Sequence, residues 1–147
     1  MNLITSSLMF GALALQGAAP AGMVRSGEAG TAAEQVVQRQ LEAYNAHDID
    51  AFAATYSDDV EIVQHPGIVR AKGKAALKSY YGPFLQRLKP VARVPHRTVM
   101  GDRIADVEAI TLEGTEYCCA VAVYQVKSGL ISRVDLIASD DFMKAKK

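Results

Sequence analysis

Residues 41–67 read LEAYNAHDIDAFAATYSDDVEIVQHPG, and this stretch decides the fold. Its first residues continue an apolar helical repeat, and Asp48 is suited to cap a second, short helix. Ser57-Asp58-Asp59 has the composition of a turn. Alternating residues from Val60 to Gln64 then predict a strand, which Pro66-Gly67 ends. The stretch therefore predicts a helix end, a short helix, a turn and a strand, in that order.

Upstream of this stretch, the spacing of apolar residues predicts a first helix from Ala32 to Ala46. His47 follows where the helix ends, because histidine is among the residues that tolerate a positive φ. The second, short helix is expected from Ile49 to Tyr56. Residues 26–31, which precede the first helix, are polar and glycine-containing and are expected to form a linker.

Downstream, Ile68–Ala71 predicts a second short strand, and Lys74–Leu88 a third helix whose pattern Gly82-Pro83 interrupts. The rest of the chain has a strand pattern broken by tight turns. Short loops between strands imply antiparallel neighbours. The expected strands are Val91–Met100, Arg103–Leu112, Thr115–Lys127 and Leu130–Ser139.

Helices followed by a meander of strands predict an α+β fold. We expect three N-terminal helices to pack on one face of a curved, mostly antiparallel sheet, which curls into a cone-shaped α+β barrel. An apolar pocket is expected between the sheet and the helices. The domain is expected to span residues 32–140, between a signal peptide or disordered extension at 1–31 and a polar tail at 141–147.

The charge balance argues against two classes of partner. The chain of 147 residues has sixteen basic and sixteen acidic side chains, and its formal net charge is zero. A neutral chain without a cluster of lysines and arginines lacks the electrostatic footprint of a nucleic-acid or anionic-membrane protein. The length suits a single domain.

The first 24 residues contain no charged side chain. Leu8–Leu15 is an apolar run too short to span a bilayer, which takes about 20 residues. Small residues at 19–21 follow it, as at a signal-peptidase site. This pattern predicts a periplasmic or secreted protein, whereas translation from Met23 would predict a cytoplasmic one.

The two cysteines, Cys118 and Cys119, are adjacent within a predicted strand. Neighbouring side chains of a regular strand point to opposite faces, so a disulfide between them is not expected. Two thiols alone do not make a zinc site either. We expect two small buried side chains, with Cys118 in the wall of the pocket.

Three motifs together resemble the SnoaL-like branch of the nuclear transport factor 2 superfamily. They are the opening stretch 41–67, RAKGKAALKSYY at 70–81, and VAVYQVKSGLISRV at 121–134. The superfamily includes ketosteroid isomerases, polyketide cyclases, dehydratases, epoxide hydrolases and non-catalytic binding domains. The resemblance therefore implies the fold and leaves the function open.

The resemblance also places the catalytic positions of the isomerases on this chain. The position of their base corresponds to His65, and the positions of their two oxyanion donors correspond to Gln40 and Ala122, with Tyr44 one turn from the first. Tyr81 matches a tyrosine that supports the donors. Loss of one such donor typically costs ~10²–10³ in rate. Ordinary ketosteroid isomerase activity is therefore not expected.

Two function classes remain open. One is a domain that binds a small apolar molecule, for example a steroid- or polyketide-like one, without cofactor or metal. The other is a cofactor-independent isomerase, cyclase or dehydratase with His65 as general base. His65 could equally be a surface residue at a strand end, and the tyrosines could serve packing alone. The residues expected to line the pocket are Gln40, Tyr44, Phe52, Tyr56, Gln64, Tyr80, Tyr81, Phe84, Cys118 and Ala122.

The strands also carry a polar group and an apolar face. His96, Asp106 and Glu108 lie on adjacent predicted strands, but their spacing matches no metal motif, and a solvated sheet face or an interface salt bridge is expected. If Ala122 points into the cone, Val121, Val123 and Ile131 are expected on the other face of the sheet. Such a half-apolar face predicts a homodimer through the open sheet face.

Overall fold

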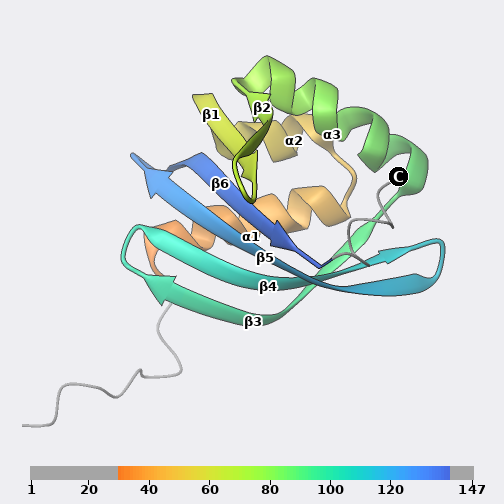
Figure 1. The fold of residues 1–147 in the computed structure, drawn as a ribbon. Coiled ribbons are helices and arrows are strands. Elements are labelled where there is room, and N and C mark those ends of the chain that lie inside the picture. Colours follow the sequence, from red (N-terminus) through yellow and green to blue (C-terminus); the bar gives the residue numbers. More distant parts are fainter. Residues whose placement is uncertain (1–29, 140–147) are drawn as a thin grey trace, which may run out of the picture.

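The computed structural model describes residues 30–139, and Figure 1 shows the arrangement of their helices and strands. The predicted signal peptide and C-terminal tail lie outside these residues. None of the helices within residues 30–139 is long and apolar enough to cross a membrane. The elements are α1 (Ala32–Asn45), α2 (Ile49–Ala54), β1 (Tyr56–Gln64), β2 (Ile68–Lys72), α3 (Lys74–Leu88), β3 (Val91–Met100), β4 (Arg103–Leu112), β5 (Thr115–Lys127) and β6 (Leu130–Ala138).

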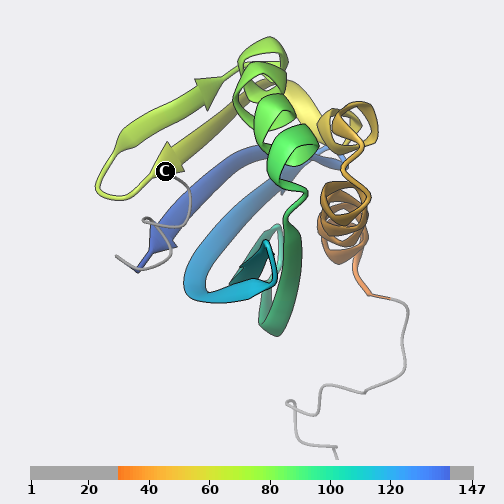
Figure 2. The ribbon, with the colours of Figure 1, turned by 90° about the vertical axis from the view of Figure 1, so that its right-hand side faces the viewer.

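The six strands form one sheet in the order β2-β1-β6-β5-β4-β3. Its neighbouring pairs are antiparallel except β1 and β6, which are parallel. The helices cover one face of this strongly curved sheet, as Figures 1 and 2 show. The predicted α+β fold and the meander of the last four strands are confirmed. The sheet stays open and does not close into a complete barrel.

Most predicted boundaries hold to within two residues, and the largest difference lies at the predicted turn. Ser57-Asp58-Asp59 lies inside β1, which begins at Tyr56. The register between β1 and β6 shifts between Tyr56 and Glu61, so these turn-forming residues occupy an irregular part of a strand. Thr31, expected in a linker, instead caps α1, and its hydroxyl accepts a hydrogen bond from the Glu34 backbone.

Phe52 lies at the centre of the core. Its side chain is fully buried, on the short helix α2. The ring centroids of Tyr56 and Tyr81 each lie 5.0 Å from that of Phe52, and the centroid of Tyr44 lies 6.0 Å away. These tilted contacts are the geometry that aromatic pairs prefer. Phe52 therefore joins α1, β1 and α3 around one side chain.

The burial of Asp106 contradicts the expectation that it lies on a solvated sheet face. It is 1% exposed, on the concave face of β4, and its carboxylate accepts two hydrogen bonds of 2.7 Å from Arg97 on β3. Arg97 also donates to the side chain of Gln38 on α1. His96 is exposed, and it pairs with Val107 rather than Asp106, so it points to the other face. The three predicted polar residues thus do not form one cluster.

The outer face of the sheet has apolar and charged residues side by side. Val121 and Val123 are partly exposed there, while Ala122 between them is fully buried, as expected. Ile131 does not join them: it is fully buried, because the register between β5 and β6 shifts between Gln125 and Val126 and turns Ile131 inward.

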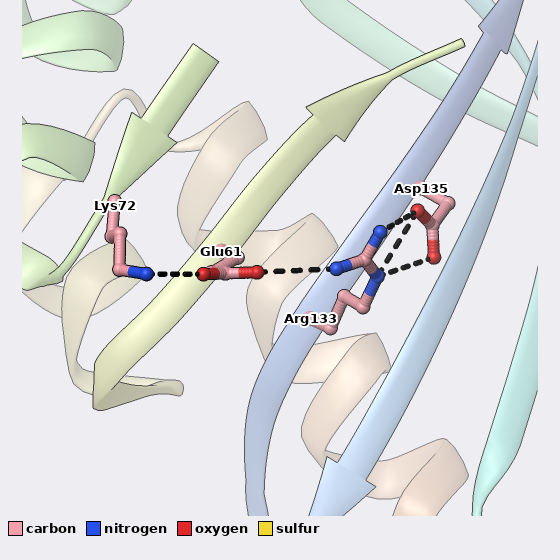
Figure 3. Close-up of polar contacts among 4 residues, drawn as sticks. All are labelled: Glu61, Lys72, Arg133 and Asp135. Carbon is pink, nitrogen blue, oxygen red and sulfur yellow. Dashed lines mark hydrogen bonds and ion pairs between the residues drawn. The ribbon is translucent and has the colours of Figure 1, made fainter. Parts of the chain in front are cut away.

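A chain of ion pairs crosses the outer face from β2 over β1 to β6 (Figure 3). Lys72 lies 2.7 Å from Glu61, and Glu61 lies 3.1 Å from Arg133. Arg133 in turn pairs with Asp135 at 2.7 Å. The bond to Lys72 lowers the pKa of Glu61, and the bond to Asp135 raises the pKa of Arg133. Charges of alternating sign thus follow one another across three strands.

The cysteines contradict the sequence-based expectation. Cys118 and Cys119 are joined in a disulfide. The register between β4 and β5 shifts here: Glu108 pairs with Ala120, and Ala109 pairs with Cys118, which leaves Cys119 as an extra residue. The alternation on which the expectation rested therefore fails at this pair, and both sulfurs reach the same side.

We predict that the buried pair of Arg97 and Asp106 dominates the polar contribution to stability. Arg97→Met should lower the free energy of unfolding by about 3–5 kcal/mol, because it leaves the buried Asp106 carboxylate without its cation. The double variant Arg97→Met/Asp106→Leu should recover most of that loss. Urea unfolding followed by circular dichroism measures both.

The matched control is the exposed pair of Arg93 and Glu116, which also joins β3 to a later strand. Arg93→Met should change stability by about 0–1 kcal/mol. Equal losses for Arg93→Met and Arg97→Met would contradict the importance assigned to the buried pair.

Candidate functional site

A cavity of about 320 Å³ lies between the helices and the concave face of the sheet. Residues from both helices α1 and α3 and from all six strands form its wall. The lining residues are Gln40, Leu41, Tyr44, Tyr56, Gln64, Arg70, Tyr80, Tyr81, Ala92, Glu108, Ile110, Ala120, Tyr124, Val134, Leu136 and Ala138.

Four buried tyrosines give the cavity neutral hydroxyl groups. Burial raises the pKa of Tyr44, Tyr56, Tyr81 and Tyr124 well above the ordinary value, with a further contribution from neighbouring tyrosines or from Glu108. Their hydroxyls therefore remain protonated at neutral pH. Protonated phenols can donate a hydrogen bond to a carbonyl oxygen while their rings contact apolar surface.

Glu108 places a carboxyl group in this wall. The hydroxyl of Tyr124 on β5 donates a hydrogen bond to Oε1 of Glu108 on β4, with an O···O distance of 2.7 Å. Glu108 is half-buried and lies at the register shift between β4 and β5. A carboxyl group oriented by a neutral phenol in a mostly apolar cavity has the setting of a general acid or base.

Arg70 and Gln64 form a second polar pair. Nε of Arg70 on β2 donates to Oε1 of Gln64 on β1, at 2.7 Å. In the backbone pairing of β1 with β2, Ile62 pairs with Ala71 and Val63 with Val69. Arg70 is therefore an extra residue that no residue of β1 pairs with in the backbone ladder. A bulge of this kind changes the direction of a side chain. It brings the guanidinium into the wall of the cavity.

The two polar pairs belong to separate parts of the cavity wall. Gln64 is on β1 and Glu108 on β4, and β6 and β5 lie between these strands. Strands are about 4.8 Å apart, which puts the two backbones roughly 14 Å from each other along the sheet. The side chains between them are mainly apolar. The wall thus has a cation on β2 and a carboxyl group on β4.

Six of the predicted site residues come together here. The shared feature is that each lines the cavity, from α1, β1 or α3. They are Gln40, Tyr44, Tyr56, Gln64, Tyr80 and Tyr81.

The other predicted site residues do not line the cavity. Phe52 and Ala122 are fully buried in the core, and Phe84 is partly buried beside Tyr44. Cys118 is exposed on β5. His65 is exposed in the turn between β1 and β2, where its backbone donates to the carbonyl of Leu136.

Glu108 and Arg70 are the charged wall residues that the sequence-based prediction missed. For Glu108 the sequence predicts a solvated sheet face or an interface salt bridge, and for Arg70 it predicts no role. Arg70 lies at an irregularity of the β1–β2 pairing, whereas Glu108 follows Ile104 and Asp106 in regular alternation and shares their face. Register shifts depend on the partner strand, so the local sequence carried no direct signal of them. Tyr124 does carry one, since a tyrosine between alternating apolar residues suits a pocket wall.

The described residues offer no metal centre. Within residues 30–139, no group of three or more histidine, cysteine, aspartate or glutamate side chains is arranged to hold a metal ion. The chemistry that these side chains themselves provide is hydrogen bonding, ion pairing and proton transfer.

Solved structures with the same fold include an uncharacterized protein, a designed binder and an epoxide hydrolase. A cystatin-fold protein from Novosphingobium aromaticivorans has a TM-score of 0.66 at 24% identity, over 74% of this chain and 99% of its own. A computationally designed 17-OHP binder has a TM-score of 0.66 at 22% identity, over 76% and 93%. An LEH-like epoxide hydrolase from Mycobacterium tuberculosis has a TM-score of 0.65 at 17% identity, over 78% and 88%. At these identities the likeness shows the fold alone.

The family is shown by the sequence itself. No curated protein matches the chain. The SnoaL-like domain, however, matches residues 37–134, which run from α1 to β6 and include most of the cavity wall. The chain therefore belongs to the SnoaL-like domain family.

Proposed function

We propose that this domain binds one small, mostly apolar molecule in the cavity between α1, α3 and the sheet. The observation that carries the proposal is the cavity itself, about 320 Å³ with a largely apolar and aromatic wall and a few convergent polar groups. Small-molecule sites typically have about 300–1,000 Å³ and this kind of wall. The size suits a compact ring compound.

The relatives support this proposal at the level of the fold. The designed 17-OHP binder shares the architecture, so a sheet and helices in this arrangement can enclose a small molecule. Within this chain, the protonated Tyr44, Tyr56 and Tyr81 provide contact area and hydrogen-bond donors together. The cavity thus combines apolar contact with the means to orient a ligand.

We predict that filling the cavity abolishes binding of an apolar probe. Ala138 lines the cavity near the end of β6, and Ala138→Phe would place a ring in it. The affinity for N-phenyl-1-naphthylamine, measured by fluorescence titration, should fall at least about tenfold, because the probe loses buried contact area.

Ala75→Phe is the matched control, since Ala75 is exposed on α3 and outside the cavity wall. It should leave the affinity unchanged. Saturable binding that survives Ala138→Phe, or the absence of saturable binding to the parent protein, would refute the proposed site.

A second candidate function is cofactor-independent proton transfer, and the pair of Glu108 and Tyr124 favours it. A carboxylate next to bound apolar substrate can take a proton from carbon beside a carbonyl. The neutral tyrosine hydroxyls can then donate to the resulting enolate oxygen. His65, the base that the family resemblance implies, is exposed in a turn, so Glu108 is the better-placed group.

This candidate predicts exchange of α-protons in a bound ketone. The parent protein should accelerate deuterium uptake by 2-tetralone in D2O, followed by NMR. Glu108→Gln should lower the rate by roughly 10²–10⁴, since it removes the base and keeps a hydrogen-bond acceptor for Tyr124. His65→Ala should leave the rate unchanged. If the rate of deuterium uptake fell only in His65→Ala, His65 and not Glu108 would be the base.

We further propose that two copies associate through their outer sheet faces. The ion-pair chain of Lys72, Glu61, Arg133 and Asp135 alternates in sign. About a two-fold axis through its middle, Lys72 faces Asp135 of the partner subunit, and Glu61 faces the partner's Arg133. The neighbouring apolar residues Val121, Val123 and Ile137 would be covered. The zero net charge of the chain offers no long-range repulsion to a second copy.

The dimer is tested by charge reversal. Sedimentation should show a dimer at micromolar concentration for the parent and a monomer for Arg133→Glu, because this substitution sets a carboxylate against the partner's Glu61. The double variant Glu61→Arg/Arg133→Glu restores opposite charges across the axis and should restore the dimer. A monomeric parent protein would rule the assembly out.

A further inference from the structure

We infer that the molecule bound in the cavity carries an anionic oxygen group, held by Arg70 at the β1–β2 end. This inference rests on the proposed binding function and adds the chemical class of the ligand: a compact apolar ring compound with one acidic group. Its apolar body would then extend toward Glu108 on β4 and Tyr124 on β5.

The direction of the Arg70 side chain is the first support. Lys72, two residues further along β2, lies on the outer face and pairs with Glu61. Regular alternation would put Arg70 on that same outer face. Because Arg70 is an extra residue in the β1–β2 ladder, it turns inward next to the buried Ala71 and joins the cavity wall. The bulge thus places a cation in a mainly apolar cavity.

The partners of Arg70 are the second support. Three arginines among residues 30–139 are partly buried: Arg70, Arg97 and Arg133. Arg97 pairs with Asp106, and Arg133 pairs with Asp135 and Glu61. Within the same residues, Arg70 has no carboxylate within 4.0 Å. A partly buried guanidinium is stabilised most by hydrogen bonds to a charged acceptor. An anionic group of a ligand would therefore provide the carboxylate-like partner that Arg70 lacks among these residues.

Gln64 orients the guanidinium for this role. Its Oε1 accepts from Nε of Arg70 at 2.7 Å, which fixes one edge of the planar group. The other edge carries the η nitrogens, a fork of N–H donors that matches an anionic oxygen group. Because these donors are already held in place, binding a ligand loses less side-chain entropy than it would with a mobile lysine.

The carboxyl group of Glu108 on β4 sets the orientation of the ligand. The carboxyl group of Glu108 lies beside Tyr124, roughly three strand spacings from Gln64 by the order of the sheet. An anion would be repelled by the carboxylate of Glu108 and attracted by Arg70. The acidic group therefore lies at the β1–β2 end, and the neutral part of the ligand faces Glu108 and the tyrosine hydroxyls.

The test uses two fluorescent probes that differ by one anionic group. 1-Anilinonaphthalene-8-sulfonate carries a sulfonate, and N-phenyl-1-naphthylamine is the same ring system without it. Arg70→Met keeps an apolar stem of similar length and removes the charge. It should weaken binding of the sulfonate probe roughly 10- to 100-fold and change binding of the neutral probe less than about twofold. Arg70→Lys should recover part of the loss, since it restores the charge without the fork.

Arg93→Met is the matched control, because Arg93 is an exposed arginine outside the cavity wall. It should leave both affinities unchanged, and thermal unfolding should show that each variant is folded. If Arg70→Met lowered the affinity for both probes equally, or for neither, the inference would be overturned while the binding function stands. If neither probe binds the parent protein, the binding function itself fails.

Discussion

The contact of Phe52 with three tyrosine rings is the constraint on which the site depends. Tyr44, Tyr56 and Tyr81 come from α1, β1 and α3, and each packs against the one fully buried ring of α2. Packing of this density fixes the rings and, with them, the positions of three hydroxyls in the cavity wall. Core and cavity are therefore parts of one arrangement.

Two strands supply the charged groups of the site. Arg70 is the extra residue of β2, and Glu108 lies beside the register shift of β4 against β5. The bulge directs Arg70 toward the concave face, whereas regular alternation with Ile104 and Asp106 puts Glu108 there. The buried pair of Arg97 and Asp106 and its bond to Gln38 tie α1 to the strands next to this site. The fold thus combines a regular apolar wall with a few well-directed charges.

The sequence predicted the parts of the structure that local patterns determine. Helical spacing and turn residues gave α3 and three of the last four strands with their observed bounds, and His47 has the positive φ expected at the end of a helix. The six cavity residues that were predicted lie on α1, α3 or β1. Arg70 and the Cys118–Cys119 disulfide were missed because they lie at bulges in the β1–β2 and β4–β5 hairpins, which regular alternation does not predict, and Glu108 was placed on the wrong face. Ile131 was misplaced because of the register shift between β5 and β6.

The most direct test of the account is a crystal structure of the protein with bound 1-anilinonaphthalene-8-sulfonate. The account predicts electron density for the rings between α1, α3 and the concave face, in contact with Tyr44 and Tyr81. It predicts the sulfonate at the β1–β2 end, within hydrogen-bonding distance of the η nitrogens of Arg70. Density for the probe only outside this cavity, or a cavity filled by side chains, would contradict the central claim.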